Sequence, residues 1–333
     1  MENDIQQELF KAIKKKIPDH LSAADEIGKI LGISPDSAYR RMRGEKPVTL
    51  DELHKICAHY KVSVDQLMNI QTDAFIFFGK VVNPKNFSFN EYLGSMMEYM
   101  QMMQSFNSKE LFYLCKDIPL FHHFQVRELA AFKYYFWMKT LFHFPEFASK
   151  KFSLDDYPEE TFLLGKQNLN LYHQLNSYEL WNFETLNSTL HQIEYYYDAN
   201  MFQSEQDALR MYDALDQFLD HLEKQAELGY KFKIDDPDRK PLGSFKMYFN
   251  DVVTLDNSIL AVLDGTKISF LTHTIFNFMV SRDLRFTEAA YENIQTLMRK
   301  STLISSVSEK ERMRFFNRMR DKINRRRQAV QLG

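Results

Sequence analysis

The sequence predicts a mainly α fold, and three observations lead to this prediction. Glycine and proline are scarce, with 10 and 9 in 333 residues, which favours helices over turn-rich β architectures. Residues that cap helices, such as Ser22, Ser34 and Thr49, precede several apolar runs. Apolar residues in the first 70 positions recur mostly at spacings of three and four, the helical period. We therefore expect a helical domain at 1–70, a linker at 71–87 and a mostly helical domain at 88–333.

The first 70 residues predict five short helices. Four helix starts carry N-cap or capping-box signals, namely Ser22 with Asp25, Ser34 with Pro35, Thr49 with Glu52, and Ser63 with Gln66. The apolar side chains expected to face inward are Ile27, Leu31, Ile33, Ala38, Met42, Leu50, Leu53, Ile56, Cys57, Tyr60, Val62, Val64, Leu67 and Met68. Short helices joined by tight turns follow from this spacing.

The rest of the chain predicts further helices and a small β element. Ser88 and Glu91 open a methionine-rich helix, and other helices are expected at 125–144, 159–174, 178–197 and 205–229. A small sheet or hairpin is expected at about 245–272, because Asp264-Gly265 separates two apolar, β-branched runs. Helices resume at about 287 and in a basic C-terminal helix at 308–328.

Composition bounds the class of protein. Apolar residues make up 44% and charged residues 26%, which is typical of a folded soluble chain. Two cysteines, Cys57 and Cys115, are too few for a disulfide framework. The first residues contain no apolar signal core, and the longest nearly apolar stretch, 270–280, is too short to span a bilayer. We expect a cytoplasmic protein with no membrane partner.

Residues 24–43 have the pattern of a helix-turn-helix. Gly28 is the small residue of the first helix, Gly32 makes the turn, and the apolar positions of both helices face each other. The outward face of the second helix then carries Ser34, Asp36, Ser37, Tyr39, Arg40 and Arg43. Short polar side chains followed by arginine are what a helix needs to enter the major groove of DNA.

Residues 21–68 resemble the lambda-repressor/Cro-type helix-turn-helix family, also called the XRE family. The resemblance lies in the Gly32 turn, the Arg43-Gly44 end of the second helix, the helix that starts at Thr49, and the closing Val-Ser-Val-Asp-Gln-Leu. It departs from the family at Arg41, where an apolar residue is usual. The resemblance implies a transcriptional regulator that binds operator DNA, usually as a dimer.

These observations together predict a partner and a set of contact residues. The partner is double-stranded DNA, and the protein is expected to be a homodimer. We expect Ser34, Asp36, Ser37, Tyr39 and Arg40 to contact bases, and Arg41, Arg43 and Lys46 to hold phosphates. The domain at 88–333 would supply dimerisation and could also sense an effector.

Charge leaves a second interpretation open. Residues 1–70 contain 11 basic and 11 acidic side chains, residues 71–298 have a net charge of −11, and residues 299–333 have +8. A neutral N-terminal domain on an acidic body also fits a protein-interaction adaptor that uses a repressor-like fold without DNA. The basic C-terminal helix could be a phosphate-contacting arm, a dimer helix, or a surface helix packed on the acidic body.

No catalytic or metal motif supports an enzyme. The chain has no glycine-rich phosphate loop, no G-x-S-x-G and no H-E-x-x-H. His54, Cys57 and His59 lie near each other, but no second pair of ligands follows at zinc-finger spacing. The aromatic runs at 134–137 and 195–197 fit a core or an apolar ligand pocket, and the methionine-rich helix fits a core or an adaptable interface. We expect no enzymatic activity, no cofactor and no metal.

Overall fold

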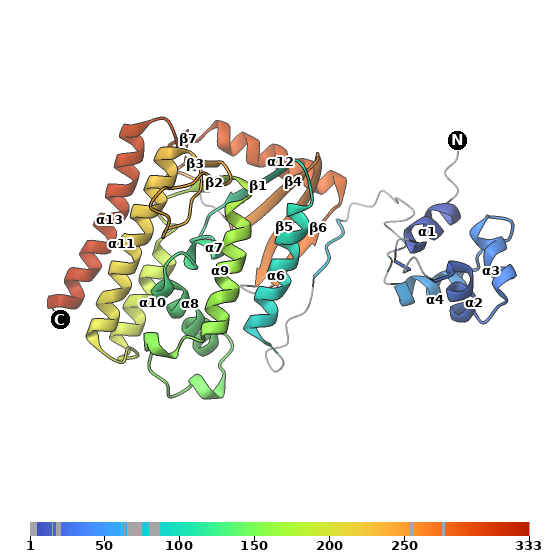
Figure 1. Ribbon diagram of the computed structural model, residues 1–333, viewed down its shortest axis with the longest axis horizontal. Helices are drawn as coiled ribbons and strands as arrows, with labels where there is room; N and C mark the ends of the chain where they lie inside the picture. Colours follow the sequence, from blue (N-terminus) through green and yellow to red (C-terminus); the bar gives the residue numbers. More distant parts are fainter. Residues whose placement is uncertain are drawn as a thin grey trace. The chain divides into compact units, whose positions relative to one another are not determined.

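The computed structural model describes residues 5–14, 16–17, 21–60, 62, 64, 75–79, 87–253, 256–274 and 277–332. The chain divides into two compact units, Met1–Ile76 and Phe77–Gly333 (Figure 1). The boundary falls within the expected linker at 71–87, of which the structure describes 75–79 and 87. None of the helices in the described ranges is long and apolar enough to cross a membrane.

The N-terminal unit contains four described helices, α1 (Ile5–Lys14), α2 (Ala23–Leu31), α3 (Pro35–Met42) and α4 (Leu50–Tyr60). The predicted caps are formed: Ser22 Oγ accepts the Asp25 N–H at 3.4 Å, and Ser34 Oγ accepts the Ser37 N–H at 3.3 Å. The fifth helix, predicted to begin at Ser63, falls on residues outside the described ranges.

The core of this unit gathers side chains from all four helices. Its buried apolar residues are Leu9, Phe10, Ile13, Ile17, Ile27, Ala38, Ile56 and Cys57. Half of them come from α1 and the residues just after it, a contribution that the predicted inward positions did not include. Leu50 was expected to face inward but is 82% exposed, because it lies at the first residue of α4, beyond the edge of the core. Leu67 and Met68 lie outside the described ranges.

The body is built around a mixed β-sheet. Its seven strands in the described part of the chain are β1 (Lys109–Leu114), β2 (Asn176–Trp181), β3 (Phe245–Phe249), β4 (Ser258–Leu263), β5 (Thr266–Thr274), β6 (Asn277–Ser281) and β7 (Thr302–Leu303). Their order is β6-β5-β4-β1-β2-β3-β7. β1, β2 and β3 are parallel, and the flanking strands pair antiparallel. The predicted mainly α class is therefore wrong, because the body is α/β and the small β element at 245–272 is one part of a larger sheet.

Four strands lie outside the predicted β element, and two of them, β1 and β2, lie in the middle of this sheet. Both of their faces are covered, so they lack the alternation of apolar and polar residues that marks a strand with one exposed face. The helix expected at 178–197 is wrong in its first part for this reason. β2 occupies that part, and a helix begins only at Asn187.

The described α-helices of the body are α6 (Phe89–Gln104), α7 (Leu120–His123), α8 (Arg127–Phe136), α9 (Glu159–His173), α10 (Asn187–Asp198), α11 (Glu205–Leu228), α12 (Leu284–Arg299) and α13 (Glu309–Leu332). The predicted helices at 159–174 and 205–229 are confirmed by α9 and α11. The helix predicted at 125–144 is α8, which continues into a π-helical turn at Trp137–Leu141.

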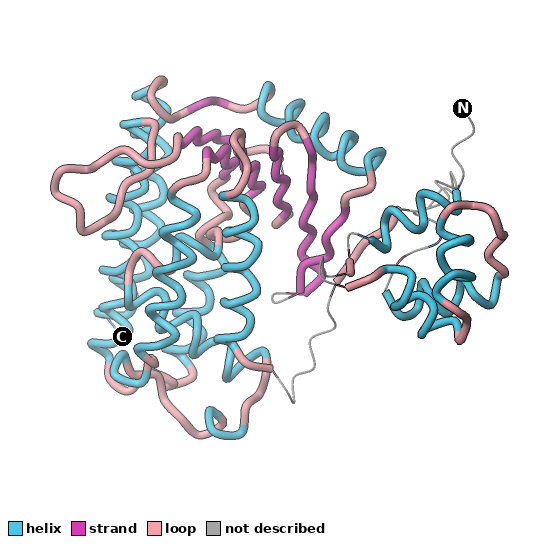
Figure 2. Tube along the Cα trace, turned by 45° about the vertical axis from the view of Figure 1, so that its right-hand side comes forward, coloured by secondary structure: helices cyan, strands magenta, loops and turns pink. Residues whose placement is uncertain are grey.

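Helices cover the sheet unequally (Figure 2). The large core lies between one face of the sheet and the helices α6 to α11 and α13, while α12 covers the other face through Ile294 and Met298. The connections from β1 to β2 and from β2 to β3 contain α7 to α9 and α10 to α11. Parallel strands need a crossover of at least about a dozen residues, usually helical, and these two crossovers hold five of the described α-helices of the body.

The basic C-terminal helix packs on the acidic body. Arg320 of α13 pairs with Asp220 at 2.7 Å and with Glu223 at 2.5 Å, both on α11. Arg327 pairs with Asp216 on the same helix. Of the three interpretations open for this helix, the structure shows the one in which it packs on the acidic body.

A short piece of the expected linker pairs with the sheet. The Phe78 N–H donates to the Val280 carbonyl and the Val280 N–H donates to the Phe78 carbonyl, each at 2.7 Å. The Phe77 ring packs edge-on against Phe286 of α12, with centroids 4.9 Å apart. The chain is therefore attached to the outer edge of β6 just after the N-terminal unit ends.

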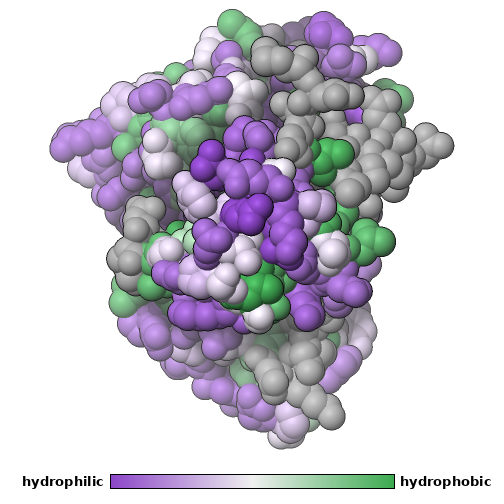
Figure 3. Space-filling model, turned by 90° about the vertical axis from the view of Figure 1, so that its right-hand side faces the viewer, coloured by the Kyte–Doolittle hydropathy of each residue, from purple (hydrophilic) through white to green (hydrophobic). Residues whose placement is uncertain are grey.

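Among the described residues visible in Figure 3, hydrophilic side chains predominate and hydrophobic ones form small, separate patches. Singly exposed apolar side chains, such as Val252 at 88% and Leu284 at 71%, are ordinary on folded proteins.

Candidate nucleic-acid interface

The turn between α2 and α3 needs glycine at two positions. Gly32 ends α2 with a φ of 69°, in the left-handed region that favours glycine. Gly28 lies against the start of α3, where an added Cβ would lie 2.9 Å from the Ile33 carbonyl oxygen. The two glycines let α2 and α3 pack closely, as a helix-turn-helix requires.

The outer face of α3 presents charged and aromatic side chains. Asp36, Arg40 and Arg43 are exposed, and Tyr39 keeps 51% of its surface accessible. Lys46, in the loop after α3, is exposed as well. These five predicted contact residues lie where a ligand can reach them.

Two further predicted contact residues, Ser34 and Ser37, form hydrogen bonds with each other at the start of α3. Ser34 Oγ accepts the Ser37 N–H, and the two hydroxyl oxygens lie 3.1 Å apart. Ser34 is exposed and Ser37 is half-buried. Their hydroxyls can still accept or donate one more bond, but their first role is to cap α3.

The prediction that Arg41 holds a phosphate is wrong, because the structure buries this side chain. Its side chain is only 5% exposed. Its guanidinium donates from Nε to Glu52 Oε2 at 3.0 Å, from Nη2 to Glu52 Oε1 at 2.7 Å, and from Nη1 to the Ser37 carbonyl at 3.1 Å. The hydrogen bond from Arg41 holds the pKa of Glu52 below its ordinary value. Arg41 therefore ties α3 to α4, in the place where the resembled family has an apolar residue.

Glu52 serves two purposes at once. Its Oε2 also accepts the Thr49 N–H at 3.0 Å, and Thr49 Oγ1 accepts the Glu52 N–H at 3.3 Å. This is the capping box that the sequence predicts. The same carboxylate thus caps α4 and anchors α3.

Gln6 of α1 is a structural residue that the sequence analysis missed. Its amide nitrogen donates to the Arg41 carbonyl at 2.7 Å and to the Lys46 carbonyl at 2.8 Å, and its oxygen accepts the Val48 N–H at 3.0 Å. These bonds fix the loop that follows α3. No local pattern identifies them, because the partners lie 35 to 42 residues apart.

One acidic side chain, Glu45, faces the two exposed arginines at the end of α3. Its carboxylate lies 3.1 Å from Arg43 Nε and 3.7 Å from Arg40 Nε. The Arg43 guanidinium also lies over the Tyr39 ring, 5.8 Å from its centroid. Ion pairs this exposed are weak, so a phosphate can compete for the same arginines.

The body contains a polar cluster that is closed to solvent. Glu179 of β2 is 0% exposed and accepts hydrogen bonds from the Tyr172 hydroxyl, from Trp181 Nε1 at 2.8 Å, and from His122 Nε2, 3.0 Å away. Burial raises the pKa of Glu179, but His122 and these hydrogen bonds lower it by more, so it stays below its ordinary value. Nearby, burial lowers the pKa of Lys231 to about 7. With no exposed member, the cluster is part of the core rather than an accessible site.

The comparisons with known proteins concern the N-terminal unit. Residues 9–79 match the BetR domain, a family of helix-turn-helix-like DNA-binding domains. The match supports a DNA-binding regulatory role. No curated protein and no solved structure matches the chain. The helix-turn-helix prediction is confirmed at this level, while the lambda-repressor/Cro assignment stays a prediction.

Proposed function

We propose that this protein is a sequence-specific transcriptional regulator of the lambda-repressor/Cro type, which places α3 in the major groove of DNA. The observation that carries the proposal is the division of α3 into two faces. Ala38 and Arg41 are buried against the other helices, whereas Asp36, Tyr39 and Arg40 face outward. Arginine can donate two bonds to guanine, and aspartate can accept from the cytosine amino group.

The proposal assigns separate roles to the remaining side chains and to the body. Arg43 and Lys46, both exposed, would contact phosphates on either side of the groove. One helix of this length reads only a few base pairs, so we propose a homodimer that spans two successive major grooves about 34 Å apart. The body would supply the dimer contacts and an effector site, with no catalytic role.

Selection from a random duplex library tests this function directly. The full chain is incubated with the library at low and moderate salt, beside an Arg40→Ala/Arg43→Ala variant and an Arg210→Ala/Arg325→Ala control, whose two arginines are exposed on the body. We expect enrichment of an inverted repeat that the first variant loses and the control retains. No enrichment at either salt, with the variant and the parent indistinguishable, would overturn the proposal.

A second candidate function is a protein-interaction adaptor that does not bind DNA. The observation in its favour is that Glu45 faces both Arg40 and Arg43, in a domain whose basic and acidic side chains are equal in number. Salt separates the two candidates. Arg43 and Lys46 of both subunits would make four phosphate contacts, so the logarithm of the DNA-binding constant should fall with the logarithm of the salt concentration with a slope of about −4. An adaptor of this kind would not bind DNA at any salt concentration.

A further inference from the structure

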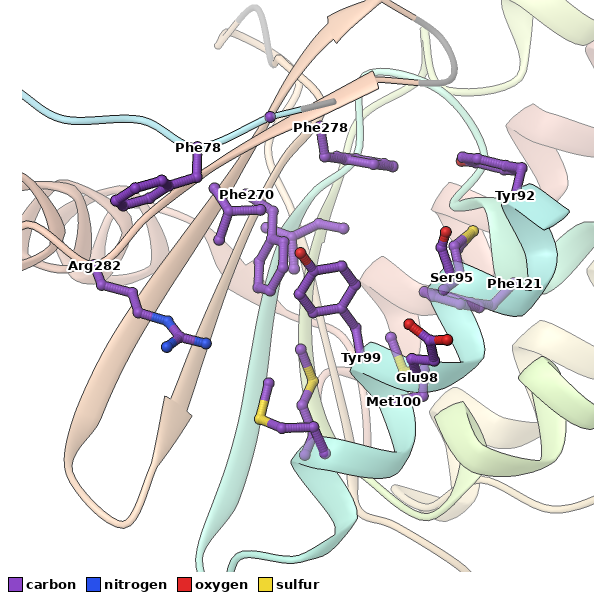
Figure 4. A pocket seen from close by; sticks show the side chains of 16 residues that line it. Phe78, Tyr92, Ser95, Glu98, Tyr99, Met100, Phe121, Phe270, Phe278 and Arg282 are labelled. Carbon is purple, nitrogen blue, oxygen red and sulfur yellow. The ribbon is translucent and has the colours of Figure 1, made fainter. Parts of the chain in front are cut away.

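The body contains a cavity of about 590 Å³ between α6 and the strands β5 and β6 (Figure 4). Its size lies within the range of small-molecule sites, roughly 300 to 1,000 Å³. Met96 and Met100 of α6 form one wall, and Phe270 and Phe278 of the strands form the other. The wall is mostly apolar, and methionine side chains adapt to occupants of different shapes.

The rim of the cavity carries one unpaired positive charge. Arg282, directly after β6, is exposed, and among the described residues no side chain of opposite charge pairs with it. The neighbouring Asp283 caps α12 by accepting the Phe286 N–H at 3.1 Å. In Figure 4 the Arg282 side chain extends toward the side of the cavity where Tyr99 lies. Arg282 is therefore placed to receive an anion from a molecule in the cavity.

One negative charge on the facing helix restricts that molecule further. Glu98 of α6 lines the same cavity and is exposed, again with no charged partner in the described part of the chain. An acidic group that came near this carboxylate would be repelled by it. The charges of the rim thus favour one acidic group over two.

The wall also includes Phe78, the residue that bridges to Val280 on the edge of β6. An occupant that touches Phe78 adds contacts to this bridge and stabilises it. The bridge lies just after the N-terminal unit along the chain. Occupancy of the cavity is therefore linked to how firmly the connecting segment is held on the sheet.

We propose that this cavity binds an apolar monocarboxylic acid, with its hydrocarbon body among the methionine and phenylalanine side chains and its carboxylate on Arg282. Burial of hydrocarbon supplies the affinity, and the arginine fixes the orientation. The site would be the effector site of the regulator, and only that regulatory role rests on the proposed function. Binding of the acid itself does not depend on DNA.

Calorimetry of the full chain tests the ligand class with four matched probes. Decanoate, decanol, decylammonium and the ten-carbon dicarboxylate share the same chain length. We expect one decanoate per chain, with decanol about fivefold weaker and the dicarboxylate weaker than decanoate. In Arg282→Ala, decanoate should fall to the affinity of decanol, while decanol is unchanged. Arg325→Ala, which removes an exposed arginine on α13, should change neither.

A blocking variant checks that the probes occupy this cavity. Ser95 lies on the α6 wall, so Ser95→Trp should abolish decanoate binding while circular dichroism shows an unchanged fold. Phe78→Ala should weaken decanoate severalfold without filling the cavity. Tighter binding of decylammonium than of decanoate, or decanoate affinity untouched by both Arg282→Ala and Ser95→Trp, would overturn the proposal. Calorimetry needs no DNA. A failure of the library selection can therefore be told apart from a failure of decanoate to bind this cavity.

Discussion

The two units both bury ionisable side chains, but at different depths. In the N-terminal unit, the Arg41 and Glu52 side chains remain 5% and 17% exposed, at the junction of α3 and α4. In the body, His122 and Glu179 are both 0% exposed, beneath the helices that cover the sheet. The first pair replaces apolar packing at the edge of a small core, whereas the second lies inside a large one. Loss of a partner should therefore cost most in the body, where no water can take its place.

Glu179→Leu should have the largest effect on stability. The leucine leaves His122, the Tyr172 hydroxyl and Trp181 Nε1 without their shared acceptor. We expect the free energy of unfolding of the body to fall by about 4 kcal/mol. Tryptophan fluorescence during denaturant unfolding measures this, because both tryptophans, Trp137 and Trp181, belong to the body.

The control for Glu179→Leu removes an exposed acid instead. Glu160→Gln, on the first turn of α9, should change the same transition by less than about 0.5 kcal/mol. If Glu179→Leu proved as mild as this control, the network would not stabilise the sheet, and the contrast between the two units would disappear.

Arg41→Met should come next in size and should act on the other unit. Methionine restores the apolar character usual in the resembled family, but it leaves the Glu52 carboxylate half-buried with only the Thr49 N–H as donor. We expect the N-terminal unit to lose about 2 kcal/mol, less than the breaking of a fully buried pair. Far-ultraviolet circular dichroism follows both units, so the loss should appear there and not in tryptophan fluorescence.

A second variant sharpens the Arg41 result. In Arg41→Met/Glu52→Gln the charge is absent and the capping bond to Thr49 can persist, so about half of the lost stability should return. If the double variant were less stable than Arg41→Met alone, the Glu52 carboxylate would stabilise α4 even without its arginine.

The contrast between the units also explains what the sequence could predict. The helix-turn-helix is encoded by neighbours: Gly32 makes the turn, and Ser34 and Thr49 cap helices within three residues of themselves. The burial of Arg41 did not follow, because its partner Glu52 lies 11 residues away on another helix. An arginine where an apolar side chain is usual was the available signal.

In the body, the contacts that form the sheet join residues even farther apart in the sequence. β1 pairs with β2 through Leu111 and Ser177, and with β4 through Leu111 and Ala261, so no local period shows these strands. The β4–β5 hairpin was predictable, since Asp264 and Gly265 have the positive φ values of a tight turn. From the sequence, the methionine-rich helix fitted either a core or an adaptable interface. In the structure this helix is α6, and its Met100 is both buried and part of the cavity wall.

Acid should separate the units without any substitution. Burial lowers the pKa of His221 to about 4 in the folded body, whereas the same histidine in the unfolded chain has a pKa of about 6.5. Between these two pH values the unfolded chain binds a proton that the folded body does not. The stability from this histidine is complete above pH 6.5 and is lost as the pH falls toward 4, by about 2 kcal/mol at pH 5. Glu52 has a lowered pKa, so its contribution is complete above 4.5 and is lost only as the pH falls through its folded value. Between pH 6.5 and 5 the body should weaken while the N-terminal unit keeps its stability.

Two histidine substitutions test the acid prediction. His221→Phe should remove about 2 kcal/mol of the loss in body stability between pH 7 and 5, whatever its effect at neutral pH. His191→Phe, at an exposed position of α10, should leave the loss unchanged. An equal pH dependence in both variants would mean that other buried histidines, such as His173, account for the weakening.

Glu45→Gln should have the smallest effect, and only on binding. Its carboxylate pairs with Arg40 and Arg43 on the outer face of α3, so it competes with the phosphates of the proposed DNA site. The pairs are exposed and weak, and freeing them should tighten DNA binding about threefold with no change in stability. Glu26→Gln removes the same charge from α2, where its partner is Lys29, and serves as the control in fluorescence anisotropy titrations. An equal gain in both variants would indicate a general charge effect. A gain confined to Glu45→Gln, with the salt slope steeper by about two because each subunit of the proposed dimer adds one contact, would show that Arg43 meets phosphate directly.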